Sequence, residues 1–385
     1  MTENRPTTPL HRICNLAIVA IFVAGLLLPT IDNCFEIDPA PPLVENRNPA
    51  ARPAWPAGWK GVPAYIKGLE AYYNDHLGFR KWLIRAYDRI HVRVFAVSPI
   101  DMVDLGKQGW IFLGKDWVRE YYRGTRNLDA AGLEKWRRVH EERRDWLESM
   151  GIPYYYLVAP NKSTIYPEYM PDHLNRVTTD TAMDRVVAYL GAHSDFRIID
   201  IRRDLIEAKP RSLLYSAKDS HWNDYGAYIG YKRLMDALAE RFPGLRPQPL
   251  SEFKVLTTAH PRWSVQTQGT GELICDTDGE NLKYIELEPL RPRRARFGYI
   301  DRRTFKTEID DPSLPTAVVI HDSFYSPLYF FVSEHFRRVV YYKRDYLDFP
   351  AEVIAREKPD VVIEENVERQ LPLPLPPNPP QVRRH

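Results

Sequence analysis

The chain has 385 residues, an apolar content of 44% and a formal net charge of +2 at pH 7. This length allows one large domain or two small ones, and the apolar content supports a sizeable core. The charge is nearly balanced and no long basic run occurs, so the sequence lacks the electrostatic footprint of a nucleic-acid-binding protein. Aromatic residues reach 12%, which fits either core packing or a surface on which sugar rings stack.

The first feature along the chain is an apolar segment, residues 13–31, that contains no charged residue. A helix of this length spans about 28 Å, close to the thickness of a bilayer core. Basic residues precede it and acidic residues follow it, so the positive-inside rule predicts that residues 1–12 are cytoplasmic and the remainder is exported. A cleaved signal peptide is the competing interpretation. Because no small-x-small cleavage site is evident near Pro29, we expect a retained, single-pass signal-anchor.

Proline-rich stretches flank the main part of the chain. Residues 32–60 contain many prolines and are predicted to form an extended tether. The folded domain is predicted to cover residues 61–370. The segment 371–385 holds six prolines and is predicted to be a disordered or polyproline extension.

The sequence contains only three cysteines, at Cys14, Cys34 and Cys275. A disulfide between the second and third is one interpretation if the compartment is oxidising, whereas free thiols are what we expect. None of the three has a setting that indicates a nucleophile.

Helical patterns and short buried strands alternate along the domain, which predicts an α/β fold with a mostly parallel sheet. A turn within 106–112 leads into a strand. Residues 250–316 are predicted to form loops and a small β insertion over the site. Further strands are predicted at 154–158, 197–201, 317–320, 338–342 and 360–363. Helices are predicted at 64–73, 81–95, 130–150, 178–192, 224–241, 328–336 and 350–357.

The residues with the strongest chemical meaning are Asp219, His221 and Ser323. Ser323 follows the apolar run 317–320, so it lies at the end of a predicted buried strand, where nucleophilic attack is sterically easy. A serine hydroxyl needs an adjacent base, histidine is the usual one, and a carboxylate fixes the tautomer of the imidazole. We therefore predict a Ser323–His221–Asp219 triad, in one of several sequence orders that triads adopt.

Simpler interpretations of the same residues exist. An Asp-x-His tripeptide is more often an ordinary hydrogen-bonded pair, and Asp322-Ser323 would also make a good helix N-cap. Asp219 and His221 could bind a metal. The sequence offers no second tight His/Cys cluster to complete such a site, so we expect no metal and no other cofactor.

Taken in order, several short motifs resemble the alginate O-acetyltransferase family of the AlgJ and AlgX type, whose members are SGNH-hydrolase-like (DHHW-like) proteins. The resemblance runs from about residue 45 to 370. It implies a flavodoxin-like fold in circularly permuted motif order, because the Asp-His block precedes the serine block. The motifs are Asp75-His76-Leu77-Gly78-Phe79-Arg80, Gly106-Lys107-Gln108-Gly109-Trp110, Ala159-Pro160-Asn161-Lys162 with Ile165-Tyr166-Pro167-Glu168, Asp219-Ser220-His221-Trp222 and Asp322-Ser323-Phe324.

The resemblance also implies roles for single residues. Asp219, His221 and Trp222 match the family's Asp-x-His-Trp, and Ser323 matches its nucleophile. A family tyrosine past the serine corresponds to Tyr329, with Tyr325 as the rival. Asn161, at the end of its predicted strand, is a candidate oxyanion donor, and a turn residue is the equal alternative. Trp222 is expected to form a wall of the site. His321 stands where relatives often have Gly or Arg.

By this resemblance the chain is expected to be a periplasmic polysaccharide O-acetyltransferase anchored in the inner membrane. The implied partners are an alginate-like polysaccharide acceptor and a membrane-bound O-acyltransferase that hands over acetyl groups. An acetyl esterase would use the same triad and differ only in admitting water as acceptor. A non-catalytic scaffold of an export complex is the third interpretation, against which an intact Asp-His-Ser set weighs.

Overall fold

The computed structural model describes residues 9–38, 48–258, 283–344 and 347–383. The described residues up to Pro99 form one compact unit, and those from Ile100 onward form a second. The predicted domain, residues 61–370, therefore spans both units. Each unit is described by itself below.

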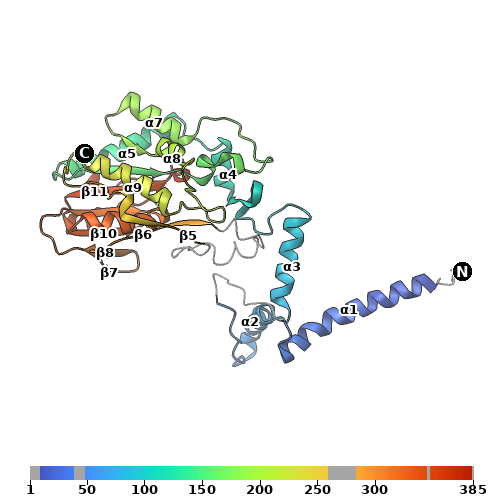
Figure 1. The fold of residues 1–385 in the computed structure, drawn as a ribbon. Helices are drawn as coiled ribbons and strands as arrows, with labels where there is room; N and C mark the ends of the chain where they lie inside the picture. The colour runs from blue at the N-terminus through green and yellow to red at the C-terminus, as the bar shows by residue number, and fades with distance from the viewer. Residues whose placement is uncertain (1–8, 39–47, 259–282, 345–346, 384–385) are drawn as a thin grey trace. The chain divides into compact units, whose positions relative to one another are not determined.

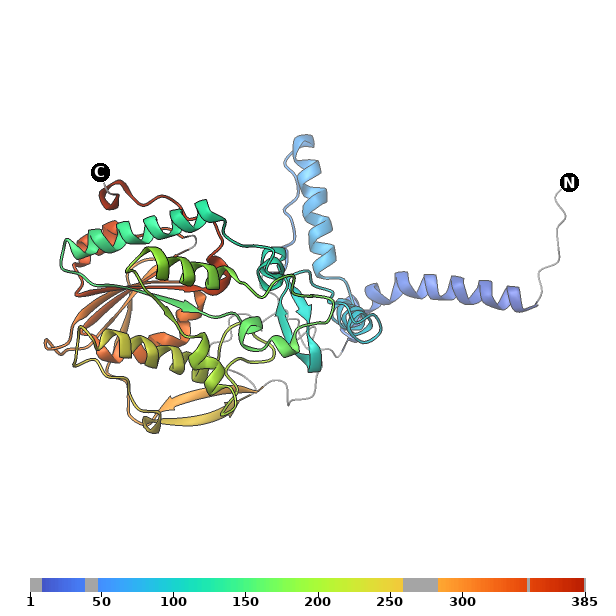
Figure 2. The same cartoon turned by 90° about the horizontal axis from the view of Figure 1, so that it is seen from above.

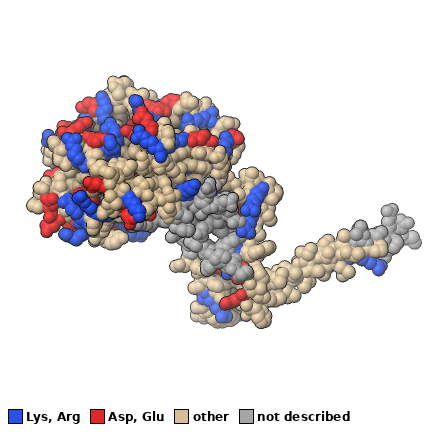
Figure 3. Space-filling view, in the orientation of Figure 1, with Lys and Arg blue, Asp and Glu red and all other residues tan. Residues whose placement is uncertain are grey.

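The described part of the first unit contains three α-helices and one short 3₁₀ turn, Trp59–Gly61, and Figure 1 labels the three α-helices. α1 (Pro9–Phe35) is long and apolar enough to cross a membrane, and Figure 3 shows that charged side chains are absent along most of its visible surface. It contains Cys14 and Cys34, which are free and exposed, whereas Cys275 lies outside the described residues. The other helices are α2 (Val62–Asp75) and α3 (Arg80–Arg93).

The second unit is built on a seven-stranded sheet in the order β4-β3-β11-β9-β10-β8-β7. The five strands from β4 to β10 pair in parallel, and β8 and β7 are added antiparallel at one edge. In chain order these strands are β3 (Tyr154–Ala159), β4 (Ile198–Asp200), β7 (Arg296–Tyr299), β8 (Thr304–Glu308), β9 (Thr316–His321), β10 (Arg338–Lys343) and β11 (Val361–Val367). The predicted α/β fold with a mostly parallel sheet is confirmed.

Helices cover both faces of this sheet (Figure 2). Successive residues of β9 serve opposite faces, as the period of a strand requires: Val319 joins one buried cluster and Val318 joins another. One face carries α5 (Ala130–Glu148), α7 (Ala182–His193) and α12 (Ala351–Glu357). The other carries α8 (Arg202–Ala208), α9 (Asp224–Leu238) and α11 (Tyr329–Val332).

Smaller elements surround the sheet. β1 (Val103–Leu105) and β2 (Ile111–Leu113) pair antiparallel across the predicted turn. β5 (Phe253–Thr258) and β6 (Tyr284–Pro289) form a second two-stranded sheet. The short helices are α4 (Asp116–Arg123), α6 (Lys162–Ile165) and the 3₁₀ segment η6 (Ser323–Leu328).

Three expectations need correction. Part of 250–316, predicted as loops and a small insertion, supplies β7 and β8 of the main sheet. The helix predicted at 328–336 is a series of short turns that includes α11. The tail is packed over its described residues rather than disordered: Leu375 joins the cluster that contains Trp136 of α5, and Asn378 is buried.

Candidate active site

Ser323 lies where the sequence placed it, directly after the carboxyl end of β9. It is partly exposed, whereas its neighbours Asp322 and Phe324 are buried. Asp322 fixes the loop: its carboxylate accepts the backbone N–H of Phe324 at 2.8 Å and that of Val367, the last residue of β11, at 2.8 Å. The serine is thereby presented at the edge where α/β sheets bind ligands.

The structure brings Ser323 together with His221 and Asp219. Nε2 of His221 lies 2.8 Å from Oγ of Ser323, and Nδ1 lies 2.9 Å from Oδ1 of Asp219. The same carboxylate oxygen accepts the backbone N–H of His221 at 2.9 Å. Both contacts are within hydrogen-bonding distance, so the three side chains form a continuous relay from a buried carboxylate to a partly exposed hydroxyl.

Lys162 holds the loop that carries Asp219. Its ammonium group is buried and lies within 3.0 Å of four backbone carbonyl oxygens. Burial alone would raise the pKa of the Asp219 carboxyl, but the hydrogen bonds and charge of His221 and the charge of Lys162 leave that pKa lowered. Asp219 is therefore ionised at neutral pH, as an orienting carboxylate must be. The four carbonyl oxygens belong to Ile111, Ser216, Ala217 and Asp219.

Trp222 connects the two loops of the relay. Its indole Nε1–H donates to the carbonyl oxygen of Phe324 at 2.8 Å, and the ring is 1% exposed. The ring of Phe324 also lies against that of His221, with centroids 4.6 Å apart. The indole is covered by protein, and the expectation that Trp222 forms a wall of the site stays a prediction. Its observed contacts position the loops.

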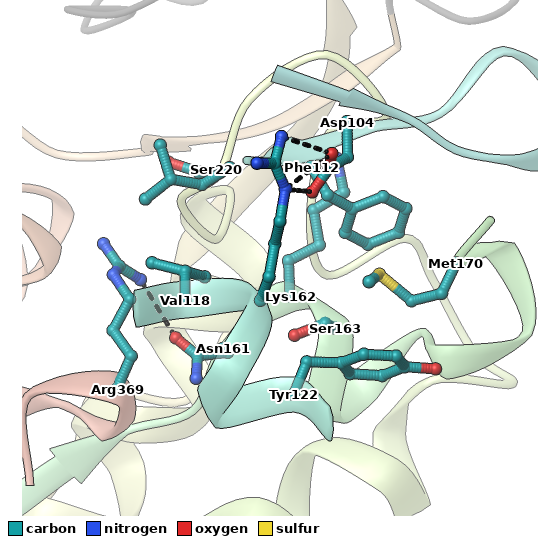
Figure 4. A pocket seen from close by; sticks show the side chains of 12 residues that line it. Asp104, Phe112, Val118, Tyr122, Asn161, Lys162, Ser163, Met170, Ser220 and Arg369 are labelled. Atoms are coloured by element: carbon teal, nitrogen blue, oxygen red, sulfur yellow. Dashed lines mark hydrogen bonds and ion pairs between the residues drawn. The ribbon is translucent and has the colours of Figure 1, made fainter. Parts of the chain in front are cut away.

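Asn161 follows β3 and lies in the small cavity of Figure 4, close to Arg369 after β11. Its backbone N–H donates to Glu368 at 2.8 Å, and its Oδ1 accepts from Arg369 at 3.0 Å. The side chain is buried, and its Nδ2 has no hydrogen-bond partner among the described residues. Because an arginine can only donate, this contact orients the amide with its oxygen toward Arg369 and leaves the NH₂ group available.

The two candidate tyrosines lie in an aromatic cluster around His321. The hydroxyl of Tyr329 is 3.0 Å from Nε2 of His321, and the rings of Tyr325 and His321 are 5.6 Å apart. Tyr325 is completely buried, whereas Tyr329 is partly exposed, and the role of either tyrosine stays a prediction. Burial lowers the pKa of His321 to about 4, which keeps its imidazole neutral inside the protein.

A metal-binding interpretation of Asp219 and His221 finds no support in the geometry. The two side chains face each other, and the second imidazole nitrogen faces Ser323. Within the described ranges, no group of three or more His, Cys, Asp or Glu side chains is arranged to hold a metal ion.

Sequence reasoning missed three residues that shape this site. Lys162 and Arg369 act through tertiary contacts, and Glu368 accepts both the N–H of Asn161 and the hydroxyl of Thr164. Glu368 and Arg369 could have been identified from the sequence because they directly follow a strand. Their position after the strand was hidden because β11 continues through charged residues beyond the predicted end at 363.

The comparisons with known proteins find similarity to SGNH hydrolase-like domains. Residues 103–274 match the family model described as SGNH hydrolase-like domain, acetyltransferase AlgX. Over 179 residues the chain is 23% identical to the "Probable alginate O-acetylase AlgJ" of Pseudomonas syringae, covering 46% of this chain and 44% of that protein. The chain thus spans less than half the length of this relative.

Two solved structures are similar to the chain. Bacillus cereus PatB1 superposes with a TM-score of 0.51 at 12% identity, over 74% of this chain and 99% of that one. The O-acetyltransferase domain of Pseudomonas putida AlgJ is 19% identical over 71% of this chain and 93% of that one, with a TM-score of 0.45. The family model and the curated relative both show that part of this chain is similar to the SGNH hydrolase-like acetyltransferases of the AlgJ and AlgX type.

Proposed function

We propose that this protein is an O-acetyltransferase that modifies an exported polysaccharide through an acetyl-enzyme on Ser323. The observation that carries the proposal is the relay itself: 2.9 Å from carboxylate to imidazole and 2.8 Å from imidazole to hydroxyl. Such an arrangement activates a serine for acyl transfer. The name of the AlgJ relative, an alginate O-acetylase, supports acetyl as the acyl group.

In the first half-reaction, Oγ of Ser323 attacks the carbonyl carbon of the donor's acetyl group while Nε2 of His221 takes the hydroxyl proton. The tetrahedral intermediate collapses, the donor's leaving group departs with that proton, and the acetyl group remains as an ester of Ser323. The charge of Asp219 stabilises the imidazolium that exists between the two proton transfers.

In the second half-reaction, a sugar hydroxyl gives its proton to His221 and attacks the ester carbonyl. The acetyl group passes to the sugar oxygen, and Ser323 recovers its proton from His221. An esterase would run the same step with water. The protein can favour sugar over water only by holding the acceptor near the ester, since proximity and orientation convert a bimolecular step into an effectively unimolecular one.

Each half-reaction develops negative charge on the carbonyl oxygen, which fixed donors must stabilise. Nδ2 of Asn161 is a candidate for this role because it has no hydrogen-bond partner among the described residues and the hydrogen bond from Arg369 fixes the amide orientation. The backbone N–H of Ser323 is the second donor of the proposal. Removing one such donor typically costs about 10²–10³ in kcat.

Helix α1 supports the proposed setting of the reaction. A helix apolar enough to cross a membrane would hold the second unit at the outer face of the inner membrane, in the periplasm, with residues 1–12 on the cytoplasmic side. A membrane-bound O-acyltransferase would then supply acetyl groups, and an alginate-like polymer would accept them.

The test is to incubate the purified full-length chain with a chromogenic acetyl ester, with and without uronate oligosaccharides. A transferase releases the chromophore faster when acceptor is present and produces acetylated oligosaccharide, which mass spectrometry detects. Release that ignores the acceptor and yields only acetate would identify an esterase. An absence of release beyond the Ser323→Ala background would favour the scaffold interpretation.

A further inference from the structure

Helices α2 and α3 each expose a continuous apolar stripe. On α3, Leu83, Tyr87, Ile90 and Val94 follow the spacing i, i+4, i+7, i+11, which places them on one face of a helix. Each is well exposed, with Ile90 at 49% and Val94, just after the helix end, at 70%. Ile66, Leu69 and Tyr73 form a similar exposed stripe on α2, which has no buried residue.

Three exposed tryptophans add to the apolar surface of this unit. Trp59, which directly precedes α2, is 92% exposed, and Trp55 is almost as exposed. Trp82 of α3 is also exposed. Isolated helices of about 14 residues are marginally stable in water, because most helical stability comes from packing an apolar face. Because the stripes of α2 and α3 are exposed, we expect an apolar environment outside the chain to cover them and stabilise the two helices.

Positive charge flanks the stripe of α3. Arg80, Lys81, Arg89 and Arg93 lie on this helix, and Asp88 is its only acidic residue. A helix that exposes apolar residues on one face with Lys and Arg beside them is the type that lies in a membrane interface, where it buries the apolar face and attracts anionic lipid headgroups.

The start of α3 is attached to the end of α1, the helix proposed to span the membrane. Asp32 of α1 accepts the backbone N–H of Phe79 at 2.7 Å, and its other carboxylate oxygen accepts that of Asp38 at 2.6 Å. Gly78 lies so close to α1 that an added Cβ would be 2.0 Å from the carbonyl oxygen of Pro29. Asp32 is the first charged residue after the apolar segment, so these contacts set the N-terminus of α3 at the depth of the headgroups.

We propose that α2 and α3 lie flat on the outer surface of the bilayer and insert their apolar stripes among anionic phospholipids. The proposal rests on the anchoring role given to α1 in the proposed function and is independent of acetyl transfer. It assigns this surface to lipid rather than to a partner protein, because the stripe of α3 has basic residues beside it and α3 begins at the point where α1 would leave the membrane.

The test measures the depth of single fluorescent labels on the full chain in nanodiscs. With the three native cysteines replaced by serine, an environment-sensitive dye is placed at Ile90→Cys, at Val94→Cys or, as a control, at Val187→Cys, an exposed position of α7 in the second unit. The discs contain phosphatidylcholine alone or with phosphatidylglycerol, and a lipid spin-labelled near its headgroup acts as quencher.

We expect severalfold stronger quenching at positions 90 and 94 than at 187, and a further increase with phosphatidylglycerol. Equal quenching at all three positions in both lipids would overturn the proposal. A label at position 90 that is shielded from water in native membranes but is not quenched in nanodiscs would also overturn it, because a protein partner would then cover the stripe. A label on the native Cys14, with the other two cysteines replaced, reports on α1 separately. Quenching there without quenching at 90 or 94 means that the anchor stands and this inference fails.

Discussion

The second unit contains two polar clusters, the relay at Ser323 and the network around Glu364. Both contain a buried carboxylate, but they differ in their exposure to solvent. The relay ends at a partly exposed hydroxyl. Glu364, in the middle of β11, is fully buried, and its carboxylate lies 2.9 Å from Arg143 and 2.7 Å from Arg344. One end of the first cluster is therefore accessible to solvent, whereas the carboxylate of the second cluster is enclosed by described residues.

The pKa values reflect this difference. Burial would raise the pKa of Glu364, but the two guanidinium groups lower it to about 2, so the carboxylate stays charged and paired. Removing one member of a buried ion pair leaves an uncompensated charge, which is far more costly than losing an exposed pair. The comparison predicts that the two clusters control different properties. Changes in the relay should remove activity and leave stability nearly unchanged. Changes at Glu364 should lower stability and should affect activity only through folding.

The largest effect is expected in the relay. Ser323→Ala and His221→Ala should each lower acetyl-ester turnover by about three orders of magnitude or more, because members of a triad act as a unit. Neither should change the melting temperature by more than a few degrees, because both side chains lie at a loop surface. Ser326→Ala, a change in the same loop, is the matched control and should keep most of the activity. Unfolding of either relay variant at room temperature would show that the relay also contributes to stability and would contradict the predicted difference between the two clusters.

The second effect is on stability. Glu364→Gln should lower the free energy of unfolding by about 3–5 kcal/mol, since it leaves Arg143 and Arg344 buried without their carboxylate. Chemical denaturation measures this change. Glu207→Gln breaks an exposed pair with Arg203 and should change stability by about 1 kcal/mol or less. A similar small change for Glu364→Gln would show that the buried network is not a stabilising element.

The third prediction concerns pH. The folded-state pKa of His321, about 4, is below its unfolded value of about 6.5. The unfolded chain therefore binds more protons between these values, and stability falls as the pH drops from 6.5 toward 4. A shift of this size corresponds to about 3 kcal/mol at 1.36 kcal/mol per pKa unit. His321→Asn should flatten this part of the stability profile, and an unchanged slope would contradict the assignment.

The smallest effect is expected in the tail. Asn378 accepts from Arg143 at 2.8 Å and donates to the carbonyl oxygen of Val139 at 2.8 Å. Asn378→Ala should cost about 1–3 kcal/mol, because it leaves buried polar groups without partners. Gln381→Ala, at an exposed position of the same segment, should be nearly neutral. Equal effects of the two changes would indicate that the tail does not pack on α5 in solution.

The sequence was most informative where a pattern is local. The buried strand before Ser323 and the Asp-x-His spacing could be recognised because each is a short continuous signal. β7 and β8 were missed because edge strands carry mixed polar and charged residues, with no apolar run. β11 was cut short at 363 because Glu364 and Glu365 look like a loop, and only the tertiary structure shows Arg143 and Arg344 beside the first of them.

The same reason explains the other errors. Lys162 binds carbonyl groups about 50 residues away on both sides along the chain, and no local pattern announces such a contact. The tail was predicted to be disordered because of its prolines, although Leu371 and Leu375 supply apolar side chains that pack on α5 and α7. Tyr325 was a candidate because of its short distance from Ser323 in sequence, and no local pattern indicated that its side chain is buried.

The measurement that tests the central claim most directly is mass spectrometry of the protein after brief exposure to an activated acetyl donor. The relay predicts a mass increase of one acetyl group, located on the peptide that contains Ser323, and its accumulation in the first seconds before acceptor is added. The label should be absent in Ser323→Ala and should disappear when an oligosaccharide acceptor is supplied. An acetyl group on a different peptide, or undiminished turnover in Ser323→Ala, would contradict the account.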